Sequence, residues 1–204
     1  NQRSPVSFHR NKMMHSGMAA IVAILFITSL LSCSHNANNA SVSSAGNVDL
    51  PLTAYVGDIA FCYPNTLEKT STFESAPFSN NNRSYIVSSS SLFDNEKNVI
   101  LIVEEYKGIA FDEVPSFFDI TGETQNANII SRQISETHIA NRKAISVQVE
   151  GSSPQGVTVS IALYIDATKD SVVAITMSCP KERSEYYIEV FHAIANSVSI
   201  DQEQ

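Results

Sequence analysis

Residues 143–178 read KAISVQVEGSSPQGVTVSIALYIDATKDSVVAITMS, and this stretch decides the fold class. Apolar and polar residues alternate along three segments, 143–150, 157–166 and 171–178, which are separated by turn residues. Such alternation is typical of strands that bury one face of a sheet, and the short connections allow only antiparallel neighbours. The stretch therefore predicts three consecutive antiparallel strands.

The polar positions of these strands suggest a docking surface. If the apolar residues of all three strands share the buried face, the opposite face carries small hydroxyls, an amide and one tyrosine. A polar sheet face of this kind can bind another protein, with the tyrosine as an aromatic contact. The candidate partner surface consists of Ser146, Gln148, Thr158, Ser160, Tyr164 and Thr176.

More strands are predicted on the N-terminal side of this stretch. These strands are predicted at 58–63, 84–89, 99–106 and 129–136. Their composition is strand-like, and most of them are bounded by turn residues. The run VILIV at 99–103 is apolar at every position, which predicts a central strand that is covered on both faces. The serines at 88–91 are read as a strand end followed by a loop.

Two helices complete the predicted fold. One follows Pro180, because apolar residues recur after it at helical spacing. These residues are Tyr187, Phe191, Ile194 and Val198. A shorter helix is predicted over 115–125. The fold class is therefore α+β, with one antiparallel sheet of about six to seven strands flanked by helices in a single domain at 48–204.

The N-terminal segment reads as a secretory signal. Arg10 and Lys12 precede an apolar run at 18–31 that is too short to cross a bilayer as a helix. The run ends in LLSC at 30–33, which resembles the bacterial lipobox. The resemblance implies cleavage after residue 32 and lipidation of Cys33; the alternative is an ordinary signal peptide with an incidental cysteine.

The region around the predicted anchor divides into three parts. Residues 1–32 are the signal peptide, and 1–12 can lie upstream of the true start because Met13, Met14 or Met18 could be the initiator. Residues 33–47 are the lipidated cysteine and a Ser/Asn-rich tether. A bilayer-anchored domain facing the periplasm is therefore expected, in the bacterial cell envelope.

The charge of the chain excludes some partners. Without the three cations Arg3, Arg10 and Lys12 of residues 1–32, the formal net charge of −8 becomes −11. Such an acidic domain is a poor match for nucleic acid or anionic lipid. The expected partners are the membrane, through the lipid anchor, and an envelope protein.

Two cysteines remain after lipidation. Cys62 and Cys179 could form a disulfide, which an exported protein permits. The alternative is a pair of small thiols that never meet, because each lies at the end of an apolar strand. Two thiols without a nearby histidine supply too few ligands for a metal site.

Few residues suggest chemistry. The domain holds two histidines, His138 and His192, and neither has a carboxylate or cysteine partner close in sequence. Six acids between 104 and 123 face the single cation Lys107, and this acidic stretch reads either as a site for a basic partner or as a solvated surface. No catalytic residue, metal ligand or cofactor is predicted.

The domain resembles the PsbP-like fold at three places. These are the glycine, phenylalanine and proline of GDIAFCYP at 57–64, the hairpin NRKA at 141–144 and the helix end ANSV at 195–198. The family includes photosystem II extrinsic subunits, a Ran-binding nuclear import factor, and DcrB-type and LpqN-type bacterial lipoproteins. The resemblance implies an α/β/α sandwich that serves for docking rather than catalysis.

Two functions are therefore expected as alternatives. The first is a lipid-anchored binding or accessory module that docks onto a membrane-associated partner with the polar sheet face. The second is an envelope small-ligand binder or hydrolase whose site is assembled from distant residues, with His138 or His192 near a carboxylate such as Asp112.

Overall fold

The computed structural model describes residues 48–80, 83–118, 120 and 129–200. Their elements, in chain order, are β1 (Leu52–Val56), β2 (Ile59–Tyr63), β3 (Glu68–Asn80), β4 (Arg83–Asp94), β5 (Val99–Lys107), η1 (Phe111–Glu113), α2 (Val114–Phe117), β6 (Ile129–Ile139), β7 (Arg142–Ser153), β8 (Gly156–Thr168), β9 (Ser171–Pro180), η2 (Lys181–Arg183), α3 (Ser184–Asn196) and β10 (Ser199–Ile200). Within these residues, no helix is long and apolar enough to cross a membrane.

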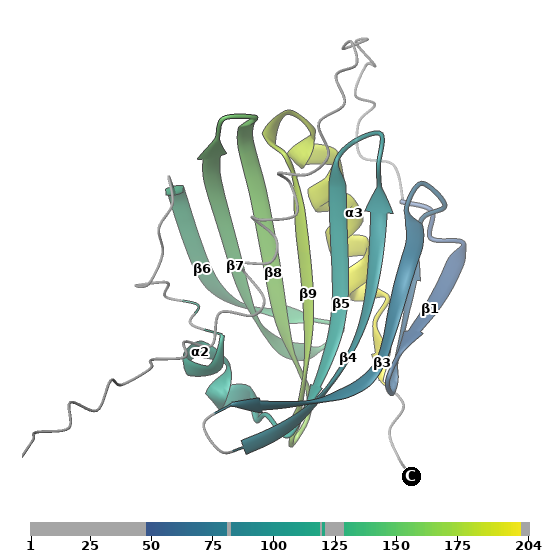
Figure 1. Cartoon of the computed structure of the whole chain (residues 1–204), viewed down its shortest axis with the longest axis vertical. Coiled ribbons are helices and arrows are strands. Elements are labelled where there is room, and N and C mark those ends of the chain that lie inside the picture. Colours follow the sequence, from purple (N-terminus) through teal and green to yellow (C-terminus); the bar gives the residue numbers. More distant parts are fainter. Residues whose placement is uncertain (1–47, 81–82, 119, 121–128, 201–204) are drawn as a thin grey trace, which may run out of the picture.

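The described strands form two antiparallel sheets (Figure 1). The large sheet has the order β3-β4-β5-β9-β8-β7-β6, and the small sheet has the order β1-β2-β10. After β5 the chain passes through η1 and α2 to β6 at the far end, and it returns through β7 and β8 to β9. Strands β5 and β9 are therefore central, while β3 and β6 are the end strands.

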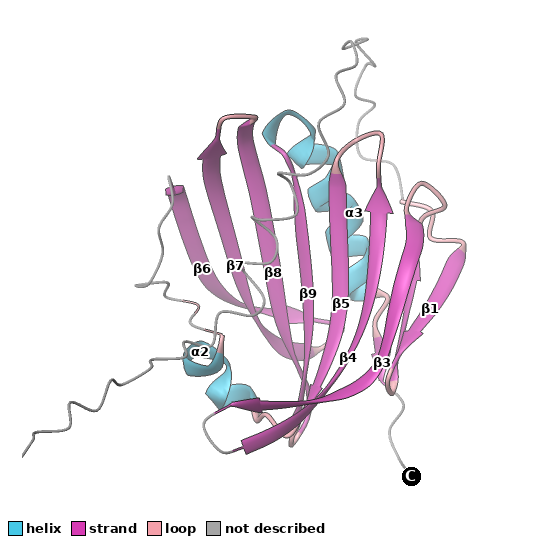
Figure 2. Ribbon diagram, viewed as in Figure 1, coloured by secondary structure: helices cyan, strands magenta, loops and turns pink. Residues whose placement is uncertain are grey.

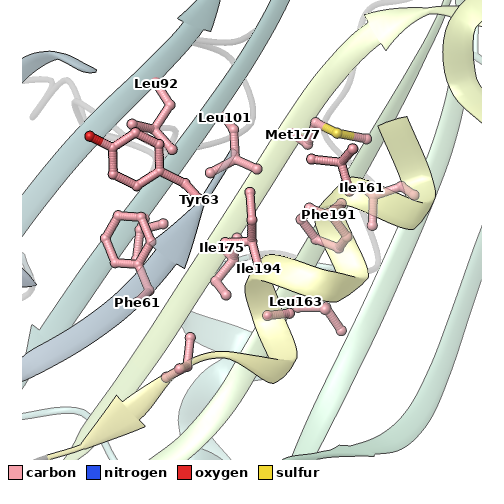
Figure 3. Close-up of a cluster of buried hydrophobic side chains, with 14 of the residues drawn as sticks. Phe61, Tyr63, Leu92, Leu101, Ile161, Leu163, Ile175, Met177, Phe191 and Ile194 are labelled. Atoms are coloured by element: carbon pink, nitrogen blue, oxygen red, sulfur yellow. The ribbon is translucent and has the colours of Figure 1, made fainter. Parts of the chain in front are cut away.

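One face of the large sheet, here called the α3 face, is covered by α3 and the small sheet. Alternate residues of β8 and β9, such as Leu163 and Ile175, meet Phe191 and Ile194 of α3 in one buried cluster (Figure 3). Phe61 of β2 extends this cluster, and it is fully buried. Burial of such side chains stabilises the fold by about 1.5–3 kcal/mol each, so this cluster is the main core.

The opposite face, here called the α2 face, carries η1 and α2 (Figure 2). Its cluster is rich in aromatic rings: Phe118 lies 4.5 Å from Tyr164 and 5.0 Å from Tyr106, between ring centroids. Phe117 contacts Tyr85 edge-on at 4.8 Å. A helix of only four residues can cover this face because Phe117, its last residue, and Phe118, which follows it, both pack against the sheet.

The structure confirms the predicted fold class, with an antiparallel sheet flanked by helices and VILIV at 99–103 in a central strand. Four corrections concern the strands. Strands β1, β3 and β10 were not predicted, and β3 occupies the region after residue 65. The serines at 88–91 lie inside β4 rather than in a loop, because they pair with β5 along their whole length.

The short helix is also shorter than predicted. Its α-helical part ends at Phe117, and residues 121–125 of the prediction lie outside the described part of the chain. The backbone N–H of Phe118 donates to the carbonyl of Val114, which closes the last turn. The predicted long C-terminal helix is confirmed as α3, although a 3-10 turn at 181–183 precedes it.

The turn between β1 and β2 fixes the small sheet onto the large one. Gly57 has a φ of +57°, and the backbone N–H of Asp58 donates to Glu105 Oε2 at 3.1 Å. Lys107 forms an ion pair with Asp58 and lies 3.9 Å from Glu105 Oε2. Burial raises the pKa of Glu105, while the hydrogen bond from Asp58 and the charge of Lys107 oppose that rise.

A second polar contact fixes α3 onto the β4–β5 hairpin. The hydroxyl of Tyr187 donates to Asp94 Oδ2 at 2.6 Å, and the backbone N–H of Lys97 donates to Asp94 Oδ1 at 3.0 Å. The side chains of Tyr187 and Asp94 are buried, at 4% and 9% exposure. The aspartate therefore receives donors from the helix and from its own turn, as a buried carboxylate requires.

Candidate functional site

The six residues of the candidate partner surface do not lie together. Thr158, Ser160 and Tyr164 are alternate residues of β8, and Thr176 pairs with Ala162 of the same series, so all four lie on the α2 face. Ser146 and Gln148 lie on the α3 face, because they pair with Leu163 and Ile161. The predicted surface is therefore wrong as a single patch.

The reason is the length of the β7–β8 turn. Ser153 pairs with Gly156 across a two-residue loop, so every odd-numbered residue of β7 pairs with an even-numbered residue of β8. Cross-strand partners share a face. Ile145 consequently lies beside Tyr164 rather than beside Ile165. A loop one residue longer would have reversed this relation, since a one-residue slip exchanges the two faces of a strand.

Tyr164 cannot serve as an aromatic contact for a partner. Its side chain is fully buried under Phe118, and Thr176 is 3% exposed, while Thr158 and Ser160 are half-buried. The hydroxyl of Tyr164 has no hydrogen-bond partner in the structure. Burial, followed by the nearby Glu104 carboxylate, raises the pKa of Tyr164. Tyr164 is therefore a core residue.

The α2 face carries a half-buried acidic group, Glu104, and an exposed one, Glu136. Glu104 is half-buried, lies in the same cross-strand row as Tyr164, and accepts a hydrogen bond of 2.9 Å from the Tyr106 hydroxyl. Burial raises the pKa of Glu104, and the hydrogen bond from Tyr106 partly offsets the rise. A carboxyl group of this kind can hold a proton, but no described histidine or second carboxylate contacts it, so it has no catalytic partner.

Replacing Glu104 with glutamine should stabilise the protein at neutral pH. The raised pKa means that the folded state binds the proton more tightly than the unfolded chain does, so the wild type loses stability as pH rises from about 4.3 through the folded pKa. The glutamine side chain would keep an acceptor for Tyr106 without a charge. We expect a higher Tm for Glu104→Gln at pH 7 and a smaller difference at pH 4, measured by thermal unfolding.

The matched control is Glu68→Gln, which removes an exposed carboxylate from β3. Its Tm difference from the wild type should be small at both pH values. A Glu104→Gln protein that is less stable than the wild type at pH 7 would contradict the proposed cost of burying this charge.

The acidic stretch at 104–123 does not form a single surface within the described residues. Glu104 and Glu105 are consecutive in β5, so they point to the α2 face and the α3 face. Glu113 accepts a hydrogen bond of 3.0 Å from the backbone N–H of Ala110 and so caps η1. Asp119 and Glu123 lie outside the described residues. The stretch supplies structural acceptors rather than one basic-partner site.

The two histidines do not assemble a catalytic site. His138 is exposed at the end of β6, and His192 is exposed on α3, where its ring lies 5.6 Å from that of Phe191. Within the described residues, neither histidine forms a hydrogen bond or ion pair with a carboxylate. Partial burial lowers the pKa of His192. The pairing of a histidine with Asp112 is therefore not found.

The cysteines do not form the disulfide that the sequence allows. Both thiols are free. Cys179 belongs to the core on the α3 face, whereas Cys62 points to the outer side of the small sheet, where its Sγ lies 3.8 Å from Thr53 Oγ1. Cys62 and Cys179 belong to different sheets and their side chains point apart, so a disulfide could not form without backbone movement. Burial raises the pKa of Cys179 to about 12, which makes this thiol unreactive.

Metal ligands do not gather in the described part of the chain, where no three His, Cys, Asp or Glu side chains come together. The predicted lipidation site Cys33, the signal peptide and the tether lie outside the described residues.

One accessible recognition feature is the outer edge of β6, here called the β6 edge. Strand β6 ends the large sheet and is exposed at most positions over its 11 residues. Ile130 and Ile134 are 56% and 43% exposed. A long end strand presents backbone donors and acceptors in a row, and an added strand can pair with them. The sequence predicted this strand, and its polar residues on both faces were the available signal of an end position.

No family model and no curated protein matches the sequence. A crystal structure from Bacteroides thetaiotaomicron VPI-5482 has a TM-score of 0.48 at 11% identity; it covers 72% of this chain, which spans 46% of that protein.

Two further solved structures bear on the sequence resemblance. Cyanobacterial PsbP (CyanoP) from Synechocystis sp. PCC 6803 has a TM-score of 0.46 at 14% identity, over 79% of this chain and 98% of that one. LpqN, described as involved in cell envelope biogenesis of Mycobacterium tuberculosis, has a TM-score of 0.43 at 12% identity, over 74% and 90%. The structural neighbours thus include PsbP-like proteins, and at these scores none assigns a function.

Proposed function

We propose that this chain is a lipid-anchored binding module of the bacterial cell envelope that docks onto a membrane-associated protein through the β6 edge. The observation that carries the proposal is the exposure of this 11-residue end strand, with two isoleucines in contact with solvent. The partner would supply an extended segment that adds to the large sheet. Backbone hydrogen bonds would give affinity, and apolar side chains facing Ile130 and Ile134 would give specificity.

The anchor follows from the lipobox-like sequence at 30–33. Acyl chains on Cys33 would hold the protein at the bilayer, since each buried methylene contributes about 0.8 kcal/mol. A tether at 34–47 would span roughly 20 Å on average. The chain enters the domain beside β1, whereas β6 lies at the opposite end of the large sheet (Figure 1). The docking edge would therefore point away from the anchored end and stay accessible.

The location and the charge agree with this role. A domain facing the periplasm meets membrane proteins and lipoproteins within the reach of its tether. The acidic surface, at −11 without residues 1–32, disfavours lying flat on anionic headgroups. The module needs no catalytic group.

The first arm of the test concerns the anchor. We expect Cys33→Ala to move the protein from the membrane fraction to the soluble fraction of fractionated cells, because the lipid attachment site is lost. Ser34→Ala, one residue further on, should leave the protein in the membrane. Retention of the Cys33→Ala protein would contradict lipid anchoring.

The second arm concerns the docking edge. The protein is crosslinked in cells, solubilised and captured, which identifies the partner. Binding of that partner to the purified lipidated protein is then measured. We expect Ile130→Thr with Ile134→Thr to weaken this binding by roughly tenfold or more, since each buried isoleucine contributes more than about 1 kcal/mol. Threonine keeps the β-branched shape, and both sites are exposed, so folding should be little affected.

Ile86→Thr is the matched control for the edge variant. Ile86 is 47% exposed and lies in β4, which four strands separate from β6. Its replacement should leave partner binding unchanged. Equal binding by the wild type and the edge variant would contradict docking at β6.

A further inference from the structure

The hairpin that follows β6 determines which of its backbone groups face outward. Ile139 pairs with Arg142 across a two-residue turn, and both turn residues have left-handed backbones, Ala140 at φ +49° and Asn141 at +65°. The two residues that flank such a type I′ turn, here Ile139 and Arg142, form a hydrogen-bonded pair. Because hydrogen-bonded and non-hydrogen-bonded pairs alternate, odd-numbered residues of β6 bond to β7, and Ile134 and its even-numbered neighbours direct N–H and C=O toward the free edge.

We propose that the strand that adds to the β6 edge is β6 of a second copy of this chain, antiparallel, with the two-fold axis at Ile134. This inference rests on the proposed docking edge and names its partner. Ile134 would exchange both backbone hydrogen bonds with Ile134 of the other copy. The two large sheets would join into one continuous sheet, and the interface would be self-complementary, as a two-fold dimer requires.

The charges on β6 select this register. Arg132, Ile134, Glu136 and His138 share the α2 face. With the axis at Ile134, Arg132 of each copy lies opposite Glu136 of the other, so two opposite-charge pairs form. An axis at Arg132 would place two guanidinium groups opposite each other, and an axis at Glu136 would place two carboxylates together. Opposite charges across strands are stabilising and like charges are destabilising.

The apolar residues favour the same register. The two-fold axis brings the exposed Ile134 side chains of both copies together, which removes apolar surface from water. Pairs of β-branched residues directly opposite each other are among the favourable cross-strand contacts. The regular pairing would run from Arg132 to His138, because β6 has a register shift between Ile129 and Ser131. The single register thus satisfies the backbone, the charges and the apolar contact.

The β6–β7 hairpin is also the least acidic part of this surface. Between 129 and 149 it carries Arg132, Arg142 and Lys143 against Glu136 alone, although the chain as a whole is acidic. Approach of two copies along this hairpin therefore brings together only one carboxylate from each copy, Glu136, and the proposed register places it opposite a guanidinium group. Anchoring in the same membrane would raise the effective concentration of the copies for each other.

Cysteine crosslinking of the full-length lipidated protein in its native membrane tests the proposal. In a Cys62→Ser background, Ile134→Cys places two thiols across the two-fold axis, where paired residues have Cβ atoms about 5 Å apart. We expect mild oxidation to convert most of this variant to a dimer on a non-reducing gel. Ser131→Cys, in the same strand, and Ile86→Cys, in β4, should stay largely monomeric.

A second pair of variants tests the register without changing Ile134. Differently tagged copies carrying Arg132→Cys and Glu136→Cys should crosslink with each other, and each variant alone should not. Adding Glu136→Arg to the Ile134→Cys protein should reduce its dimer band several-fold, because two contacts between guanidinium groups would replace the two opposite-charge pairs.

The outcomes separate this inference from the proposed function. An Ile134→Cys band no stronger than the Ser131→Cys band would overturn the dimer. If partner binding still depends on Ile130 and Ile134 in that case, the docking edge stands and its occupant is a different protein. A strong dimer through Ser131→Cys would overturn the register. Loss of both the crosslink and the dependence on the two isoleucines would overturn the dimer and the docking edge together.

Discussion

Replacing Gly57 with alanine should lower the free energy of unfolding by about 3 kcal/mol, the sum of a backbone term and a lost hydrogen bond. A Cβ atom at this position would lie 1.9 Å from Glu105 Oε2 and 3.3 Å from Ser88 Oγ. The backbone of Gly57, with φ at +57°, adds roughly 1 kcal/mol of strain for any L-residue. The carboxylate would have to move, and its hydrogen bond from Asp58 to a buried charged acceptor is worth about 1.5–3 kcal/mol.

A double-mutant cycle with Glu105→Ala separates the two terms. In the Glu105→Ala background the contact is absent, so Gly57→Ala should cost only the backbone strain of about 1 kcal/mol. Urea unfolding of the four proteins measures the difference. An equal loss in both backgrounds would show that Glu105 does not restrict residue 57, and that the β1–β2 turn is not fixed to the large sheet by this contact.

The sequence could predict seven of the ten described strands but not which faces they share. The alternation in β8 and β9 identified Leu163 and Ile175 as core residues, and both are buried on the α3 face. The alternation in β7 does not show whether its odd-numbered or its even-numbered residues share a face with Leu163 and Ile175. The two-residue β7–β8 turn decides between them, and a sequence with several turn-forming residues at 151–156 does not show where the turn falls.

The prediction that Tyr164 belongs to the partner surface was wrong for a second reason. Tyr164 sits at a polar position of the pattern, yet Phe117 and Phe118 close over that face from a helix of four residues. A helix so short has no periodicity to detect. The strand order places β6 at the end of the sheet, because β9 inserts between β5 and β8. Long-range pairing of this kind leaves no local trace in a sequence.

The polar contacts that fix the layers were equally invisible. Asp94 and Tyr187 are 93 positions apart, and Asp58 and Glu105 are 47 apart. Each carboxylate reads as an ordinary surface acid in its own segment. The fold brings a distant donor to each carboxylate. Because the donor to Glu105 is 47 positions away, the acidic stretch beginning at Glu104 could be interpreted as a partner surface.

Replacing Tyr187 with phenylalanine should lower the free energy of unfolding by about 2 kcal/mol, since a hydrogen bond to a buried charged group is worth about 1.5–3 kcal/mol. Phenylalanine keeps the packing of α3 on the core and removes only the donor to Asp94 Oδ2. Asp94 would keep the bond from the Lys97 backbone but would lose its contact with the helix. For a domain of this size, the Tm should fall by roughly 4–8 °C.

Tyr186→Phe is the matched control, because Tyr186 is the adjacent residue of α3 and is 46% exposed. Its hydroxyl faces solvent, so its removal should change the Tm by less than about 2 °C. Asp94→Asn should fall between the two variants, since an asparagine oxygen still accepts from Tyr187 but carries no charge. If Tyr187→Phe and Tyr186→Phe have the same Tm, α3 is held by its apolar face alone, and the Asp94 contact contributes nothing to docking the helix.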